Sequence, residues 1–220
     1  MRSLVHSYLF LRRAIGIIGM ALPVVLIVGY LLWPAHDVLA SISGYYYSPL
    51  RGAFVGSMCA VGVFLLSYSG TEFFEDLISD IAGVAAICVA LFPTTPPPPV
   101  SDAQHVVATV HAVSACVFFG MLALFCLLRF PRANDEGAPA TVRPQWHNFV
   151  YYAAGGVIVA SLLLVVVSSR IPGIEPIHPM LILETAAIVA FGVAWFVKGV
   201  ESVLAAPVVN EAAPQAAGVG

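Results

Sequence analysis

An apolar stretch long enough to cross a lipid bilayer is the feature that most restricts how this chain can fold. It is the run HVVATVHAVSACVFFGMLALFCLLRF from His105 to Phe130, and its apolar part, 106–128, has 23 residues. A transmembrane helix needs about 20 predominantly apolar residues to span the hydrocarbon core of a bilayer. We therefore predict a transmembrane helix in this stretch.

The composition of the whole chain agrees with a membrane location. Of its 220 residues, 60% are hydrophobic and 10% are charged, which excludes an ordinary soluble globular domain. The net charge is −3 and the basic residues are scattered along the chain, so we expect no interaction with nucleic acid. The expected environment is the lipid bilayer.

Five further apolar segments have the length of helices, so the sequence predicts an all-α, polytopic membrane bundle of six transmembrane helices. The predicted helices cover residues 14–33, 52–68, 77–92, 105–128, 148–168 and 179–200, in a single domain over 1–204. The first apolar run has about 20 residues, longer than the apolar part of a signal peptide, and is expected to be retained. Residues 205–220 are rich in Ala, Pro and Gly and are predicted to be a disordered cytoplasmic tail.

The distribution of positive charge predicts the orientation of this bundle. Seven of the nine Lys and Arg residues fall on the face that also carries both termini: Arg2, Arg12, Arg13, Arg129, Arg132, Arg143 and Lys198. Only Arg51 and Arg170 fall on the other face. Because cytoplasmic loops carry the excess of Lys and Arg, both termini are predicted to be cytoplasmic, in the inner membrane of a bacterium.

Two ionisable residues lie at similar depth in the outer half of the predicted bundle. His111 is six residues beyond His105, about 9 Å along the helix, and Glu184 is five residues beyond Pro179, about 8 Å along the last helix. An ionisable side chain inside a membrane marks a functional site by default. The alternative is that the two side chains bond each other, or nearby serines and tyrosines, and only hold the bundle together.

Further polar residues lie where the chain enters the second helix. Arg51, at the mouth of that helix, is expected to reach His111 or Glu184. Ser43 and the three tyrosines Tyr45, Tyr46 and Tyr47 would form the rim of the pocket, although adjacent tyrosines are also typical of an interfacial aromatic belt. The leading hypothesis is an extracytoplasmic pocket that binds a polar small molecule, a small anion, a lipid headgroup or protons.

Two other classes of function stay open. A zinc-dependent membrane hydrolase acting on lipid would take its metal ligands from His105, His111, His178 and Glu184. No metal or other cofactor is predicted, because the sequence contains neither H-x-x-x-H nor H-E-x-x-H, and His105 and His111 point about 120° apart on a helix. The other alternative is a non-enzymatic accessory subunit with a membrane-protein partner. Two ridges of small residues, Gly52/Gly56/Ala60 and Gly155/Gly156/Ala160, suit close helix contacts.

Several segments resemble an uncharacterised family of small bacterial and archaeal membrane proteins. They are SISGYYYSPLRGAFVGSMCAVGVFLLSYSG (41–70), VALFPT (89–94), HAVSA (111–115) and ETAAIVAFGVAWFVKG (184–199). The resemblance implies a six-helix membrane fold and supplies no activity. Where that family has S-x-Y-Y-x-T-P-x-R-D, this chain has Ser48 for the threonine and Gly52 for the aspartate. A weaker similarity is to membrane hydrolases of the ceramidase and adiponectin-receptor type, whose seven helices and H-x-x-x-H motif this chain lacks.

Overall fold

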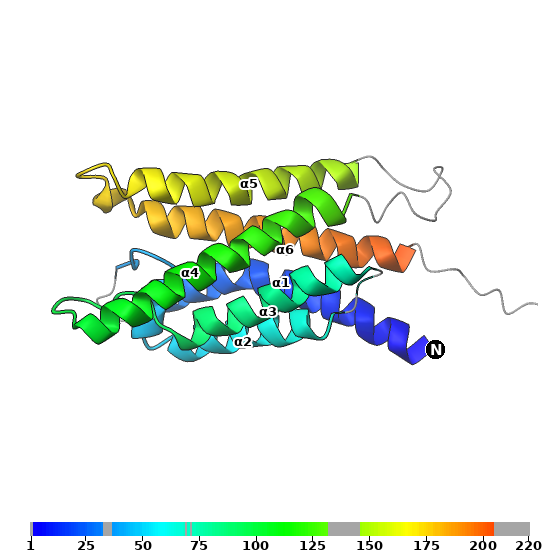
Figure 1. Cartoon of the computed structure of the whole chain (residues 1–220), viewed down its shortest axis with the longest axis horizontal. Helices are drawn as coiled ribbons and strands as arrows, with labels where there is room; N and C mark the ends of the chain where they lie inside the picture. Colours follow the sequence, from blue (N-terminus) through cyan, green and yellow to red (C-terminus); the bar gives the residue numbers. More distant parts are fainter. Residues whose placement is uncertain (1, 33–36, 69, 71, 132–145, 205–220) are drawn as a thin grey trace, which may run out of the picture.

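All regular structure is helical in the part of the chain that the computed structural model describes, which is residues 2–32, 37–68, 70, 72–131 and 146–204 (Figure 1). The α-helices are α1 (Arg2–Leu31), α2 (Arg51–Leu66), α3 (Phe73–Leu91), α4 (Asp102–Leu124), α5 (Trp146–Ser168) and α6 (Pro179–Leu204). Two short 3₁₀-helices, η1 (Ser43–Tyr47) and η4 (Glu175–Ile177), and a π-helical turn, η2 (Phe125–Arg129), complete them. The all-α prediction is confirmed for these residues.

Four helical stretches are long and apolar enough to cross a membrane. They are Phe10–Leu31, Asp102–Arg129, Trp146–Ser168 and Glu175–Val200. Helix α2 is also apolar but has only 16 residues, and α3 has 19 residues with Glu75, Asp76 and Asp80 among them. The protein is therefore a helical bundle with the composition of a membrane protein.

The helices lie roughly along one long axis in Figure 1, and neighbours in sequence are mostly neighbours in space. Helix α2 packs on α3, α3 on α4, and α5 on α6, while α1 packs most extensively on α6. The N-terminus, the start of α3 and the ends of α4 and α6 lie at one end of the bundle, at the right of Figure 1. The opposite end carries η1, the connection from α3 to α4, and η4.

Glycines bring two pairs of helices close together. A Cβ added to Gly16 of α1 would lie 2.7 Å from the Cβ of Phe196, and one added to Gly192 of α6 would lie 2.8 Å from the backbone nitrogen of Met20. Helices α2 and α3 meet in the same way at Gly62 and Gly83. Small residues at such positions allow two backbones to approach within van der Waals contact.

The small-residue ridge predicted at Gly52 and Gly56 makes no helix contact within the described chain, because a Cβ added at either position would meet no atom within 4 Å. The ridge on α5 is partly confirmed: Gly155 packs against Leu127, whereas Gly156 faces open space. Helical periodicity identifies a face of small residues, but the face that is used depends on where the partner helix lies.

Two helices begin four or more residues earlier than predicted. Helix α1 extends from Arg2 rather than from residue 14, and α3 begins at Phe73 rather than at residue 77, so Glu75 and Asp76 form its first turn. Carboxylates in a first turn interact favourably with the helix dipole, which explains why α3 includes them. The predicted tail 205–220 and the residues Arg132 and Arg143 lie outside the described residues.

The contact between α1 and α6 makes a direct test possible. Gly192→Ala should lower the melting temperature, because overpacking of a close contact costs about 1–3 kcal/mol. Gly156→Ala, on the open face of α5, should leave it unchanged or raise it, since alanine favours a helix over glycine by about 1 kcal/mol. Thermal unfolding of both purified variants in the same detergent measures the difference, and equal melting temperatures would contradict the described packing.

Candidate functional site

His111 of α4 and Glu184 of α6 line the same cavity, which lies between α4, α5 and α6. The cavity has a volume of about 180 Å³. Its other polar lining comes from Ser41, Ser43, Thr94 and Ser161, and most of the rest of its wall is apolar. His111, Glu184 and Ser43 also line a second, smaller cavity of about 30 Å³ beside Phe118. The prediction from helix depth that His111 and Glu184 converge therefore agrees with the geometry.

The carboxylate of Glu184 is held by the segment that precedes α2. One oxygen accepts hydrogen bonds from the backbone N–H of Ile42 at 2.6 Å and of Ser43 at 3.3 Å, and the other accepts one from Ser43 Oγ at 3.3 Å. These amides lie at the start of η1, where backbone N–H groups are free to bind a negative charge. The N–H of Leu181 adds a bond to the carbonyl of Ala40, so this segment is fastened to the first turn of α6 beside the cavity.

His111 is oriented by the end of α3. Its Nδ1 lies 2.7 Å from the carbonyl oxygen of Phe92, the residue that follows the last residue of α3. Because a carbonyl can only accept, Nδ1 carries the proton, and in the neutral ring Nε2 has a free lone pair. The side chain is buried, with 5% of its surface exposed. The contact fixes the ring so that Nε2 can act as a hydrogen-bond or proton acceptor.

Arg51 lies on a different cavity from His111 and Glu184. Its guanidinium is stacked over the ring of Tyr46, 4.0 Å from the centroid, and donates to the hydroxyl of Tyr46. Arg51 and Tyr46 line a groove of about 330 Å³ with Gly52, Val55 and residues of α3. The residues predicted to form one pocket are thus divided between two.

The remaining tyrosines have separate positions. Tyr47 donates a hydrogen bond of 2.7 Å to the carbonyl of Thr94, which ties η1 to the connection between α3 and α4. Tyr45 is completely buried and packs edge-on against Tyr30, with ring centroids 5.4 Å apart. Burial raises the pKa of the Tyr45 phenol, so this ring remains neutral and serves the packing of the segment beside the cavity.

The four residues named as potential zinc ligands do not converge. His105 is exposed in the first turn of α4, and His178 follows η4; neither of them lines the cavity with His111 and Glu184. Within the described part of the chain, no group of three His, Cys, Asp or Glu side chains is arranged to hold a metal ion. His36 lies outside the described residues.

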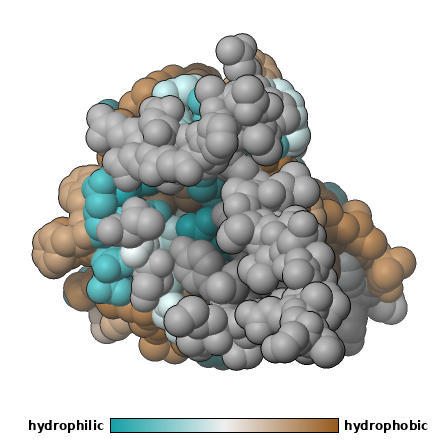
Figure 2. All heavy atoms as spheres, turned by 90° about the vertical axis from the view of Figure 1, so that its right-hand side faces the viewer, coloured by the Kyte–Doolittle hydropathy of each residue, from teal (hydrophilic) through white to brown (hydrophobic). Residues whose placement is uncertain are grey.

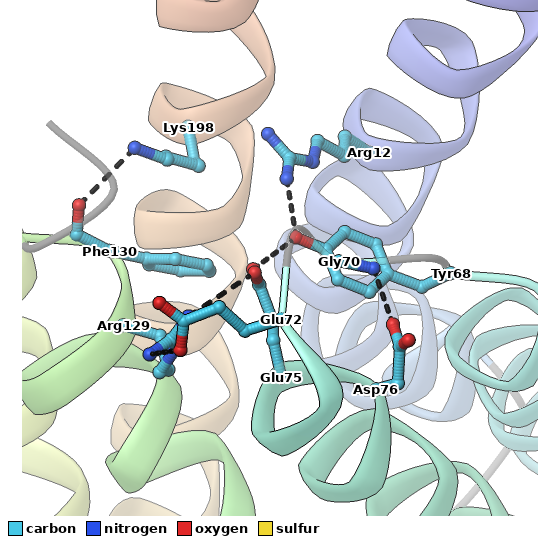
Figure 3. A network of polar contacts seen from close by, with 9 residues as sticks. All are labelled: Arg12, Tyr68, Gly70, Glu72, Glu75, Asp76, Arg129, Phe130 and Lys198. Atoms are coloured by element: carbon cyan, nitrogen blue, oxygen red, sulfur yellow. Dashed lines mark hydrogen bonds and ion pairs between the residues drawn. The ribbon is translucent and has the colours of Figure 1, made fainter. Parts of the chain in front are cut away.

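A second polar cluster, which no motif in the sequence predicts, lies at the other end of the bundle (Figure 3). Arg129 pairs with Glu72 at 2.9 Å and with Glu75 at 3.6 Å. Tyr68 donates to Glu75 at 2.5 Å and accepts a hydrogen bond from Arg12, so the side chains of Arg12, Tyr68, Glu75 and Arg129 point toward one another. Apart from Glu72 these side chains are buried, and they join α1, the end of α2, α3 and α4.

A π-helical turn places Arg129 in this cluster. Residues Phe125–Arg129 continue α4 in a π-helix, an irregularity that often occurs at functional positions. Nearby, Lys198 of α6 donates to the carbonyl of Phe130 at 3.2 Å. The signal in the sequence was the acidic stretch 72–76 on the same predicted face as Arg12, Arg129 and Lys198. Figure 2, which looks onto this end, shows hydrophilic residues there and hydrophobic flanks.

A chain of aromatic rings separates the cavity from the charged cluster. Phe118, which lines the smaller cavity, lies 6.5 Å from Phe191 between ring centroids, and Phe191 lies 5.1 Å from Trp195. Trp195 lies in turn 5.7 Å from Tyr68 of the charged cluster. Along α6 the order is Glu184, Phe191, Trp195 and Lys198, so the aromatic rings occupy the middle of the bundle.

Comparison with protein-family models, with curated proteins and with solved structures finds no match for this chain. The family resemblance described above therefore stays a prediction.

Glu72 and Glu75 offer a matched test of the charged cluster, because both pair with Arg129 and differ in burial. The Glu75 side chain is 4% exposed and the Glu72 side chain 48%. Glu75→Gln should lower the free energy of unfolding by about 3–5 kcal/mol, since it removes the buried carboxylate that pairs with Arg129 and accepts from Tyr68, and leaves Arg129 only the more exposed Glu72. Glu72→Gln should cost about 0–1 kcal/mol. Unfolding in mixed detergent micelles measures both, and a larger loss for Glu72→Gln would contradict the described burial.

Proposed function

We propose that this chain is a multipass membrane protein that binds a small molecule in the cavity between α4, α5 and α6, through hydrogen-bond donors or a positive charge on the ligand. The observation that supports this most directly is that His111 and Glu184 line one largely apolar cavity, and that none of the described residues lining it is Lys or Arg. The polar end of the ligand would meet acceptors, and its body would contact the apolar wall.

The hydrogen-bonding capacity of the site favours a donor. An ionised carboxylate offers about four lone-pair positions, and Glu184 uses three of them for Ile42 and Ser43. The free capacity of Glu184 and Nε2 of His111 both accept, and the hydroxyl of Ser161 can rotate to suit the ligand. An ammonium, amine or hydroxyl group satisfies this set. A small anion is disfavoured, because it would face a carboxylate while Arg51 lies on another cavity.

The apolar wall of the cavity determines the chemical nature of the rest of the ligand. Ala115, Phe119, Leu162 and Leu183 come from three helices and contribute to an apolar surface that suits a short hydrocarbon chain or a small ring. Such a ligand is either a free amphipathic amine or alcohol, or the headgroup end of a lipid. Protons would be exchanged at the same two side chains, since imidazole and carboxylate both titrate.

The proposed setting is a six-span bundle in the inner membrane with both termini in the cytoplasm. Helix α2 packs along α3, and α3 packs along α4, which supports the crossing of α2 and α3 together with the four longer spans. Arg12, Arg129 and Lys198 gather at the end of the bundle that carries the N-terminus, and Arg51 lies at the other. With the positive-inside rule, this distribution supports a cavity in the extracytoplasmic half.

Cys116 provides a probe of the cavity, because it lines the wall and is the only exposed residue among the four cysteines. In a Cys59→Ala, Cys88→Ala, Cys126→Ala background, we expect hexylammonium to slow the reaction of Cys116 with a water-soluble maleimide, and hexanoate to have no effect. The two compounds have similar apolar chains and opposite charges. Equal protection by both would refute recognition of a donor or positive charge.

The role of Glu184 is tested in the same assay. Glu184→Gln should weaken protection by hexylammonium by at least about tenfold, because a hydrogen bond to a charged group contributes about 1.5–3 kcal/mol. Glu175→Gln, an exposed carboxylate in η4 at the same end of the bundle, is the matched control and should behave as the parent. Ala115→Leu, which fills the cavity, should reduce protection without changing charge. Unchanged protection in Glu184→Gln would rule out the proposed site.

A further inference from the structure

The groove between the start of α2 and the end of α3 is separate from the cavity of the proposed function. It has a volume of about 330 Å³ and is lined by Tyr46, Arg51, Gly52 and Val55 on one side and by Ala90 and Leu91 on the other. A Cβ added to Gly52 would meet no atom within 4 Å, so the groove is open above this residue. Its shape is therefore a shallow channel that begins at a cation and continues along two apolar helices.

No acidic side chain in the described part of the chain neutralises the charge at the mouth of the groove. Arg51 forms no ion pair there, and its side chain contacts the ring and the hydroxyl of Tyr46. The hydroxyl of Tyr46 accepts from Arg51 and keeps its own proton available for donation. Stacking on the ring holds the guanidinium in place, which lowers the entropy lost when it binds an anion.

The first turn of α2 adds a second source of positive potential. Leu50 at the N-cap provides no side-chain bond, and the N–H groups of Gly52 and Ala53 have no acceptor among the described residues. Free N–H groups at the start of a helix of this length bind phosphate and other anions. Gly52 thus brings an unpaired backbone donor into the same groove as the guanidinium of Arg51.

The surroundings of the groove decide what occupies it. Leu91, which lines the groove, is 60% exposed, and farther along the two helices Val84 of α3 and Val63 of α2 are 54% and 51% exposed. In a membrane protein such faces contact lipid. We propose that the groove binds one anionic phospholipid, with its phosphate on Arg51, Tyr46 and the amide of Gly52, and one acyl chain between Val55 and Leu91.

The experiment compares lipid retention by native mass spectrometry of the full chain, extracted from vesicles of equal parts phosphatidylglycerol and phosphatidylcholine. The parent protein should retain phosphatidylglycerol preferentially, because its headgroup carries net negative charge. Arg51→Gln should reduce this preference by roughly fivefold, the effect expected for one basic residue at an anionic surface. Arg170→Gln, an exposed arginine on a loop at the same end, is the matched control and should retain the preference.

A second pair of variants tests the groove itself. Gly52→Leu fills the channel above a residue with no close neighbour, so it should abolish retention without lowering the melting temperature. Gly156→Leu places the same side chain on an equally open position of α5 and should leave retention unchanged. Full retention in Gly52→Leu, or equal loss in Arg51→Gln and Arg170→Gln, would overturn the proposal. Lipid retention tests the groove, and protection of Cys116 from maleimide tests the cavity. The two measurements are independent, so one proposal can be refuted without the other.

Discussion

The ion pair between Glu75 and Arg129 is the interaction on which the charged end of the bundle depends. The hydrocarbon core of a bilayer offers no counter-ion and no water, so a charge buried there must find its partner inside the protein. Arg129 lies in the π-helical turn at the end of α4 and pairs with Glu75 in the first turn of α3. Tyr68 then extends the contact to Arg12 on α1. One carboxylate thus connects helices that are far apart in the sequence.

The opposite half of the bundle uses a carboxylate in a different way. Glu184 holds the segment before α2 through backbone and hydroxyl donors, with no cation beside it in the cavity. Its charge is therefore compensated by dipoles, and part of its accepting capacity is left for a ligand. Arg51, at the same end, lies on a separate groove. The cavity is thus lined by hydrogen-bond acceptors, and the groove is lined by donors.

Much of the fold follows from run length, since the apolar segment that contains His111 is too long and too apolar to be anything but a membrane-length helix. Counting residues from the start of each helix was also enough to predict that His111 and Glu184 lie at similar depth in the bundle. It did not place Arg51, because depth gives no information on the side of the bundle that a residue faces. Residue depth also did not predict the contact of Arg129 with Glu75. Arg129 lies in a π-helical turn, which has no recognisable residue pattern. Helical periodicity also predicts a face of small residues at Gly52, but it does not specify whether a neighbouring helix packs on that face.

The aromatic rings of Phe118, Phe191 and Trp195 pack against one another in the middle of the bundle. About 21 Å of α6 separates Glu184 from Lys198 at the rise of an α-helix, and Trp195 within this interval is 1% exposed. Its ring touches those of Tyr68, Phe125, Phe130 and Phe191, which belong to three different parts of the fold. Among the described residues, the interior of the bundle along this part of α6 is therefore filled by aromatic side chains. Any channel through this interval would have to displace Trp195, and with it the ring contacts that join α6 to the ends of α2 and α4.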